Sequence, residues 1–187
     1  MGEFSRIYKA DLTDRQLASL WEMVRAAGRD RKVLFGLPPM DGTQFADWLR
    51  REDESLWAIL FRGVPCGVML LDSLRGKTAD IHFCTLPFGT LRLETHAGRV
   101  PGPVGFLMYV IGTALWERNA SNGFILDTVY GTIPECHEAA LKTCARAGVK
   151  FHSKLPSFCW CYDTGDMVDG IMTISTRAEF PQWTAAL

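Results

Sequence analysis

The feature that most constrains this chain is an apolar run over residues 104–116, interrupted only by glycine and threonine. A helix with this sequence has no polar face, and it is too short to span a bilayer. We therefore expect a buried helix with a sheet and other helices packed around it. A chain of 187 residues can form such a core without disulfide or metal staples. The prediction is a single domain over residues 1–187.

Composition and charge exclude several classes of protein. Twenty basic and twenty-one acidic residues give a net charge of -1, which is too balanced for a broad basic face. We therefore expect no nucleic-acid partner and no membrane partner. The first residues carry no apolar stretch of the kind a signal peptide has. The six cysteines lie within apolar segments and are interpreted as reduced thiols, which places the protein in the cytoplasm.

Cysteine and histidine spacing does not predict a metal site. Zinc sites in proteins have ligand pairs separated by two to five residues, whereas this chain has Cys159-Trp-Cys161 and two isolated pairs, His82 with Cys84 and Cys136 with His137. The sequence therefore predicts no metal.

Hydrophobic periodicity and turn signals predict helices and strands on both sides of the apolar run. Before it we expect a strand at 3–9, a helix that begins with the capping box Thr13-Asp-Arg-Gln16 and ends at Gly28, a second helix from about 41–43, and a meander of strands at 56–61, 64–71 and 78–85. Residues 86–98 fit either a strand or a loop. The buried helix should run to about Arg118.

After the apolar run, the pattern continues with further strands and one helix. We expect a strand at 124–130, a capping box Thr132-Ile-Pro-Glu135 that opens a helix ending at Gly148, and strands at 149–154, 157–162 and 170–176. Phe158, Trp160 and Tyr162 are predicted to be core residues of a buried strand. The order predicts an α+β fold, with a mixed sheet and helices on both of its faces.

In element order and local signatures the chain resembles the GNAT acyltransferase superfamily. The similar segments are the strand at 78–85, the Arg-x-x-Gly pattern at 99–102 before a helix, and Ala147-Gly148-Val149, which looks like the family's Leu-Gly-Phe. Ala79-Asp80-Ile-His82-Phe is loosely similar to GNAT-like proteins encoded by phages. The resemblance implies the acyl-CoA N-acyltransferase fold, with a mixed, mostly antiparallel sheet, and acetyl-CoA as co-substrate.

The resemblance also implies where acetyl-CoA binds. Its pantetheine arm would lie between the strands at 78–85 and 124–130, and its pyrophosphate at the start of the buried helix. Alignment on Gly148 puts His137 at the family's cofactor-facing asparagine and Cys144 at its tyrosine acid. The candidate cofactor-binding residues are Cys84, Thr85, Arg99, Gly102, Val104, Gly105 and His137.

Three residues are candidates for proton transfer. Asp80 and His82 share one strand face, where either could act as general base, although His82 also fits a half-buried structural ring. Cys144 could protonate the leaving thiolate, or could be a small core residue. The first two helices offer four candidates for acceptor contacts: Trp21, Arg25, Trp48 and Arg50.

Three departures from the family pattern keep two functions open. Val104 and two prolines alter the pyrophosphate segment, residues 87–98 form a longer connection than usual, and the expected tyrosine and asparagine are absent. One hypothesis is an N-acetyltransferase acting on a small-molecule or protein amine. The other is a GNAT-like binding or assembly module of phage or prophage origin that has lost catalysis. A homodimer is compatible with either.

Overall fold

The computed structural model describes residues 4–34, 38–51, 55–86, 92–95, 98–116, 125–162 and 164–180, with the backbone alone for residues 92–95 and 98–101. The strands are β1 (Phe4–Tyr8), β2 (Ser55–Phe61), β3 (Val64–Arg75), β4 (Thr78–Thr85), β5 (Arg92–Thr95), β6 (Gly98–Pro101), β7 (Thr128–Pro134), β8 (Lys150–Cys161) and β9 (Asp166–Thr176). The helices are η1 (Lys9–Asp11), α1 (Asp14–Ala26), α2 (Asp30–Val33), α3 (Gly42–Arg51), α4 (Gly102–Trp116) and α5 (Glu138–Arg146).

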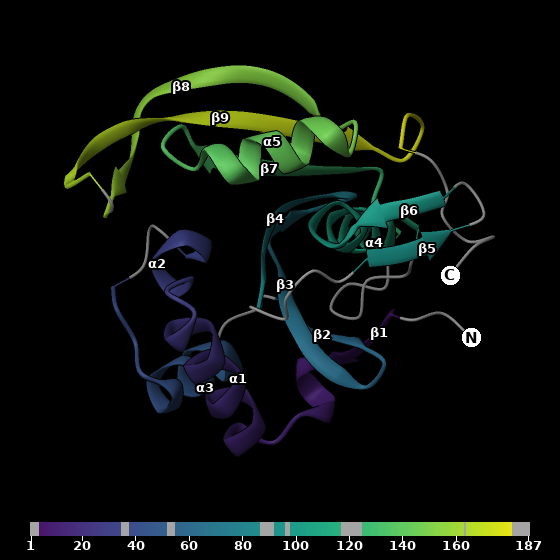
Figure 1. Ribbon diagram of the computed structural model, residues 1–187. Coiled ribbons are helices and arrows are strands. Elements are labelled where there is room, and N and C mark those ends of the chain that lie inside the picture. The colour runs from purple at the N-terminus through teal and green to yellow at the C-terminus, as the bar shows by residue number, and fades with distance from the viewer. Residues whose placement is uncertain are drawn as a thin grey trace.

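Seven strands form one sheet in the order β1-β2-β3-β4-β7-β9-β8. Within the described residues, the pairing of β4 with β7 is parallel and the other pairings are antiparallel. Helices α1, α2 and α3 lie on one face of the sheet, and α4 and α5 lie on the other (Figure 1). The predicted fold class, a mostly antiparallel mixed sheet with helices on both faces, is confirmed.

The apolar run forms α4 and is buried along almost its whole length, as predicted. It packs against one face of β2 and β3 through Trp57 and Met69, whereas Leu56 and Leu70 on the opposite face belong to the core beneath α1 and α3. These strands are therefore buried on both faces, which explains their nearly continuous apolar sequence.

The first long helix begins and ends as its sequence predicts. Thr13 Oγ1 accepts a hydrogen bond from Gln16 N at 3.2 Å, and Gln16 Oε1 accepts one from Thr13 N at 2.8 Å, which completes the capping box. Gly28 follows the helix with φ of +62°, a conformation that glycine adopts without strain. This part of the fold needs only local signals.

The predicted second capping box is wrong. Thr132 and Pro134 lie in β7, where they pair with Met172 and Gly170 of β9. Helix α5 begins only at Glu138, and its N-cap His137 makes no side-chain capping bond. The strand predicted at 124–130 is accordingly shifted toward the C-terminus; its first residue, Phe124, lies outside the described residues, as does Arg118.

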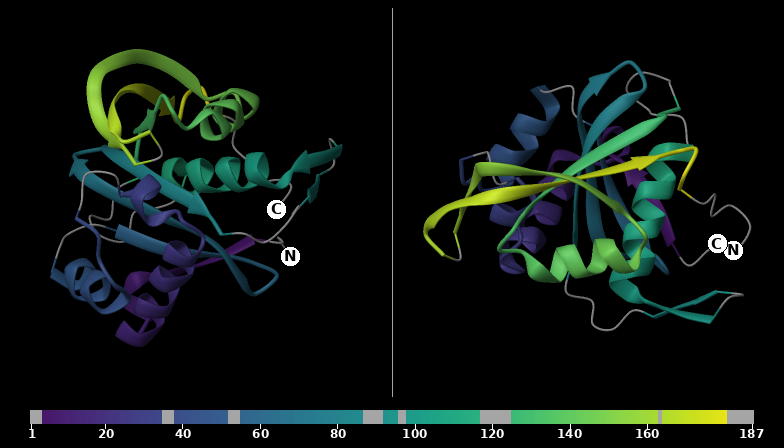
Figure 2. Two further views of the ribbon diagram at one scale, coloured as in Figure 1. Left: turned by 60° about the vertical axis from the view of Figure 1, so that its left-hand side comes forward. Right: turned by 90° about the horizontal axis from the view of Figure 1, so that it is seen from above.

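The two strands predicted at 149–154 and 157–162 form the single strand β8, which continues through a register shift near Ser157. Ser157 adopts φ of +47° there. Together β8 and β9 make a long, curved ribbon at the sheet edge (Figure 2). Phe158, Trp160 and Tyr162 are 42%, 45% and 39% exposed, so the prediction that they are core residues is wrong. Cys159 and Cys161, on the opposite face, are the buried ones.

Two global features complete the fold. The six cysteines lie in the described part of the chain, and none of them is in a disulfide. Among the described helices, none combines the length and apolar character needed to cross a membrane.

Candidate active site

The site forms where β4 and β7 separate. The two strands pair only from Thr78 with Thr128 to Asp80 with Tyr130. Beyond this point residues 81–85 of β4 remain paired with β3, while residues 131–134 of β7 remain paired with β9. A wedge opens between them, and the backbone N–H and C=O groups on this edge of β4 have no strand partner among the described residues.

Gly131 lies at the branch point of the wedge. A Cβ atom at this position would lie 3.0 Å from Thr173 Oγ1 and 3.7 Å from the Ile81 side chain. Thr173 Oγ1 instead donates a hydrogen bond of 2.9 Å to the Gly131 carbonyl, which fixes the start of the divergence. A larger residue at this position would therefore have to displace the Thr173 hydroxyl.

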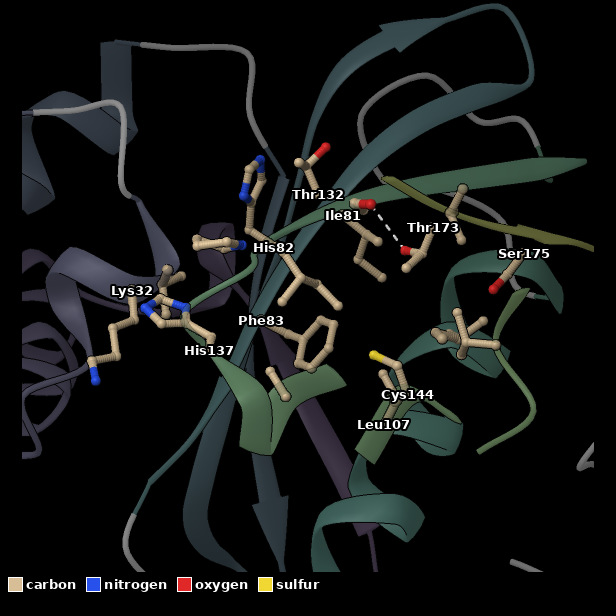
Figure 3. A pocket seen from close by; sticks show the side chains of 18 residues that line it. Lys32, Ile81, His82, Phe83, Leu107, Thr132, His137, Cys144, Thr173 and Ser175 are labelled. Carbon is tan, nitrogen blue, oxygen red and sulfur yellow. Dashed lines mark hydrogen bonds between the residues drawn. The ribbon is translucent and has the colours of Figure 1, made fainter. Parts of the chain in front are cut away.

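Two adjoining cavities occupy the wedge. A small cavity of about 90 Å³ lies at its apex between the strands, α4 and α5 (Figure 3). A larger groove of about 500 Å³ lies beside it, between the end of β4, the start of α4 and the outer face of α5. Phe83, Leu107, His137, Ala140 and Cys144 line both. The two cavities together make a cleft that reaches from the surface to the point where the strands part.

The β4 wall of the apex carries His82. Its Nε2 lies 3.0 Å from Oδ2 of Asp72, which belongs to the neighbouring strand β3. Burial raises the pKa of Asp72, but hydrogen bonds from His82 and Ser73 and the charge of His82 together lower it below the ordinary value. Asp72 is therefore ionised at neutral pH, and the His82 ring N–H donates to it. The carboxylate fixes the orientation of the imidazole.

A bulge in β3 holds this pair in place. The register of β3 against β4 shifts between Asp72 and Arg75, and Ser73 in the bulge has φ of +49°. The Ser73 side chain hydrogen-bonds Asp72 and Asp80, which are directly opposite each other in the register. Burial and the nearby charge of Asp72 raise the pKa of Asp80. Asp80 lines neither cavity, so it stands behind His82 rather than in the cleft.

Asp72 was missed by the sequence analysis. The predicted strand ended at 71 because Asp72 and Ser73 look like the beginning of a turn, whereas β3 continues to Arg75. The sequence did offer a signal for Asp72. If the predicted antiparallel pairing with the strand at 78–85 is extended by one residue beyond 71, Asp72 lies opposite Asp80.

The end of β4 contributes the two predicted cofactor-contacting residues to the groove. Cys84 and Thr85 both line it. The Cys84 side chain belongs to the core beneath α1 and α3, and burial raises its pKa to about 12, so it is an unreactive thiol. What Cys84 and Thr85 offer to a ligand is mainly the open backbone edge of the strand.

Helix α5 forms the other wall. Cys144 is 3% exposed, and its sulfur faces the apex cavity (Figure 3). Burial raises the pKa of this thiol to about 11, so it stays protonated at neutral pH. His137 is the N-cap residue of α5 and lines both cavities. Its backbone N–H donates a hydrogen bond of 2.8 Å to the Pro134 carbonyl.

The predicted pyrophosphate segment has a different form from the expected loop. Arg99 lies in β6, paired with Glu94 of β5, so the Arg-x-x-Gly pattern is the second strand of a hairpin. The Arg99 side chain is outside the described part of the structure. Gly102, Val104 and Gly105 are buried in the first turn of α4, and Pro103 is the residue of this turn that lines the groove. The structure of residues 86–98 was left open; its described residues are Leu86, strand β5 at 92–95 and Gly98, which begins β6.

Two cations at the groove were not found from the sequence. Arg29 and Lys32, at the start of and within α2, line the groove opposite α5. Arg31 of the same helix lies 4.6 Å over the ring of Tyr162, just after β8, so α2 bridges toward the β8–β9 ribbon. The sequence shows a basic cluster at 29–32, but no spacing or motif in it indicates that these residues line a binding site.

The four predicted acceptor candidates have structural roles instead. Trp21 is buried, stacks on Phe45 and donates to the Met40 carbonyl at 2.9 Å. Trp48 packs at the edge of the same aromatic group. Arg25 pairs with Glu22, and Arg50 pairs with Asp14.

The sequence and the structure were compared with those of known proteins. No known protein family matches the sequence, and no curated protein matches it either. Solved structures match the fold over nearly the whole chain. One is an acetyltransferase from Salmonella typhimurium that modifies the N-terminal serine of a 50S ribosomal subunit protein, with a TM-score of 0.68, 11% identity, and coverage of 94% of this chain and 96% of that one. This chain has the GNAT acyltransferase fold.

Two further structures with this fold contain a CoA ligand. Spermidine N-acetyltransferase from Vibrio cholerae, in complex with CoA and spermine, has a TM-score of 0.67 and 12% identity, with 95% of this chain and 98% of that one covered. Mycobacterium smegmatis RimJ, in complex with CoA-disulfide, has a TM-score of 0.65 and 14% identity, with 91% and 82% covered. Another structure of the Vibrio cholerae enzyme is dodecameric.

Proposed function

We propose that this protein is an N-acetyltransferase that transfers an acetyl group from acetyl-CoA to an amine by direct attack in a ternary complex. The observation that carries the proposal is the wedge between β4 and β7, which opens onto a groove and has an Asp72–His82 pair on its wall. The acceptor is a small-molecule or protein amine.

The groove fits the chemical groups of acetyl-CoA. The open edge of β4 offers backbone N–H and C=O groups to the amides of a pantetheine arm, in the manner of an added strand. In the first turn of α4, the N–H groups of Gly102 and Val104 have no partner within the helix, and the helix dipole favours an anion there. Arg29 and Lys32 bring positive charge to the same groove.

The walls of the wedge supply the two proton transfers. Acetyl-CoA would supply the acetyl group as a thioester. Because Asp72 holds Nε2 of His82, the imidazole uses Nδ1 to remove a proton from the acceptor ammonium, directly or through water. After the amine attacks, its nitrogen loses a second proton to solvent as the C–S bond breaks, while Cys144 donates its proton to the departing sulfur and is reprotonated from solvent. The sum is an N-acetyl amine, the CoA thiol and one released proton.

Two features of the predicted pyrophosphate segment favour the non-catalytic alternative. Pro103 removes one N–H donor from the first turn of α4, and Arg99 lies in a strand of a β-hairpin rather than in a loop. A protein with these two features and no affinity for acyl-CoA would be a binding module with an acetyltransferase fold.

Isothermal titration with acetyl-CoA, with CoA as a second ligand, distinguishes the two functions. We expect micromolar binding of both. Ala140 lines both cavities and Ala145 lies on the exposed side of the same helix, so Ala140→Trp should abolish binding while Ala145→Trp preserves it. If the folded wild-type protein gives no heat at millimolar acetyl-CoA, or if the two variants bind alike, the proposed function is wrong.

We also infer that two copies of the chain associate through β8. This strand is at the edge of the sheet, and Phe158 and Trp160 are exposed on it. Long edge strands with apolar side chains favour pairing with another strand. Sedimentation should show a dimer that Trp160→Glu dissociates; a wild-type monomer at high concentration would contradict it.

A further inference from the structure

Three potential metal ligands from separate parts of the chain meet at the rim of the groove. The ligand atoms of Cys136, His137 and Cys161 all lie within 4.8 Å of one another. Cys136 and His137 come from the turn between β7 and α5, and Cys161 ends β8. Cys136 and His137 line the groove, while Cys161 is buried behind them.

We propose that Cys136, His137 and Cys161 bind one zinc ion. Two thiolates and one imidazole form a donor set that suits Zn²⁺ and other thiophilic ions rather than Mg²⁺ or Ca²⁺. In a tetrahedral site with Zn–S bonds of 2.3 Å, the two sulfurs are about 3.8 Å apart. The observed cluster needs to contract by only about 1 Å, which side-chain rotation supplies.

Backbone hydrogen bonds hold both ligand-bearing segments. The His137 N–H donates to the Pro134 carbonyl, and the His137 carbonyl accepts from Ala140 and Leu141 in the first turn of α5. The Cys161 carbonyl accepts from Gly165 N at 2.8 Å, which closes the turn into β9. A site whose ligands are fixed by such contacts loses little entropy when the metal binds.

The three ligands leave one coordination position open. Glu135, the adjacent carboxylate, already bonds Lys154 at 2.9 and 3.0 Å, so it is held away from this role. Cys159 lies two residues from Cys161 on the same strand face but outside the 4.8 Å cluster. Within the described part of the chain no fourth donor joins the cluster, so water from the groove completes the site. Binding converts the two thiols to thiolates and releases two protons, so the affinity falls as pH is lowered.

The metal would join the start of α5 to the end of β8, across the rim of the groove. His137 would then be held by the ion rather than turning into the groove. This role does not depend on catalysis or on acetyl-CoA binding. It can therefore be tested on the protein alone.

The test uses the full chain, reduced with a phosphine and stripped with a chelator, then dialysed against Zn²⁺ or Co²⁺. We expect about one metal ion per chain by elemental analysis, a rise in Tm on loading, and a cobalt spectrum with sulfur-to-metal charge transfer and the strong visible bands of tetrahedral coordination. Cys136→Ser, His137→Ala and Cys161→Ser should each lose the ion or these bands. Cys159→Ser and His152→Ala, which change a neighbouring thiol and an exposed histidine of β8, should keep them.

Several results would overturn the proposal. These are a fully reduced wild-type protein that retains no zinc after dialysis, a cobalt spectrum without charge-transfer bands, and equal metal content in the ligand and control variants. Because the wild-type Tm shift needs no variant, a misfolded mutant does not obscure the outcome. Acetyl-CoA titration of the same samples reads the proposed function separately, so either proposal can fail without the other.

Discussion

The cleft has two walls of opposite chemistry. On the β4 wall, His82 lines the apex cavity, and the neighbouring strand β3 backs it with a charged cluster, in which a bulge places Ser73 against two carboxylates and Asp72 orients His82. The wall from α5 has instead a thiol, Cys144, that is buried among apolar side chains. Hydrogen bonds lower the pKa of Asp72 on the first wall, and burial raises the pKa of Cys144 to about 11 on the second.

This difference indicates a division of labour. A carboxylate that stays ionised can stabilise an imidazole that has accepted a proton, while a buried thiol that stays protonated can donate one. Substitutions on each wall can test whether the β4 wall accepts a proton and the α5 wall donates one.

The largest expected effect comes from removing the imidazole on the β4 wall. His82→Ala should lower kcat by about 10²–10³-fold with little change in KM for acetyl-CoA, because a general base contributes to the rate rather than to ground-state binding. Steady-state assays with an active amine acceptor measure this. His152→Ala, which alters an exposed histidine of β8, is the control. An unchanged kcat would remove His82 from the mechanism.

The second effect concerns the opposite wall. Cys144→Ala should lower kcat roughly ten-fold and Cys144→Ser less, since the hydroxyl retains a donor. Cys66 is a matched control: it is 2% exposed, burial raises its pKa to about 12, and it lines neither cavity. Cys66→Ala should cost stability without changing kcat. If both alanine variants lose stability but keep their rates, Cys144 is only a core residue.

The third effect concerns acetyl-CoA binding by the two cations that line the groove. Arg29→Ala and Lys32→Ala should each weaken acetyl-CoA binding by about 2–5-fold, because partly exposed ion pairs contribute about 1 kcal/mol or less. The loss should shrink at high salt. Titrations at two ionic strengths, with Arg15→Ala on the exposed face of α1 as control, measure it. Equal affinities in all three variants would show that these cations do not contact the ligand.

Local signals explain how much of this fold was predictable. The Thr13–Gln16 box, the two-residue turn between the strands predicted at 56–61 and 64–71, and the apolar α4 are each determined by residues close in sequence, and they were predicted correctly. Thr132-Ile-Pro-Glu135 has a capping pattern too, but pairing with β9 extends the strand through Pro134. The exposure of Trp160 likewise depends on which elements pack against that face of the edge strand β8, and the sequence of β8 alone does not encode this.

The site was less predictable because it is assembled across strands. His137 and Cys144 were named from the family pattern and His82 from its strand face, and the fold brings all three to one cavity. Asp72 reaches His82 only through the register of β3 with β4, and the bulge at Ser73 is invisible in the strand pattern. In the same way, the sequence held Cys136-His137 and Cys161 in isolated places, and spacing alone predicted no metal site there.

The smallest expected effect compares the two carboxylates within the β4 wall. The folded-state pKa of Asp72 is lowered, so this group stabilises the fold above its ordinary pKa and loses the contribution as pH falls. The pKa of Asp80 is raised, so its ionised form opposes folding at neutral pH. At pH 7, Asp72→Asn should therefore lower Tm and Asp80→Asn should raise it.

Each shift should be about 1 kcal/mol or less, roughly 1–4 °C in Tm, because both groups are partly exposed to solvent. The Asp72 effect should be lost as pH falls below the ordinary carboxyl pKa of about 4 and through the lower folded-state pKa. The Asp80 effect should fade at higher pH, as pH falls through the raised folded-state pKa toward about 4. Thermal unfolding from about pH 2 to pH 8 measures both. The two residues face each other, so the gain from Asp80→Asn should be smaller when Asp72 is already asparagine. A lower Tm for Asp80→Asn at pH 7 would contradict the raised pKa of Asp80, and additive shifts in the double variant would show that the two carboxylates do not interact.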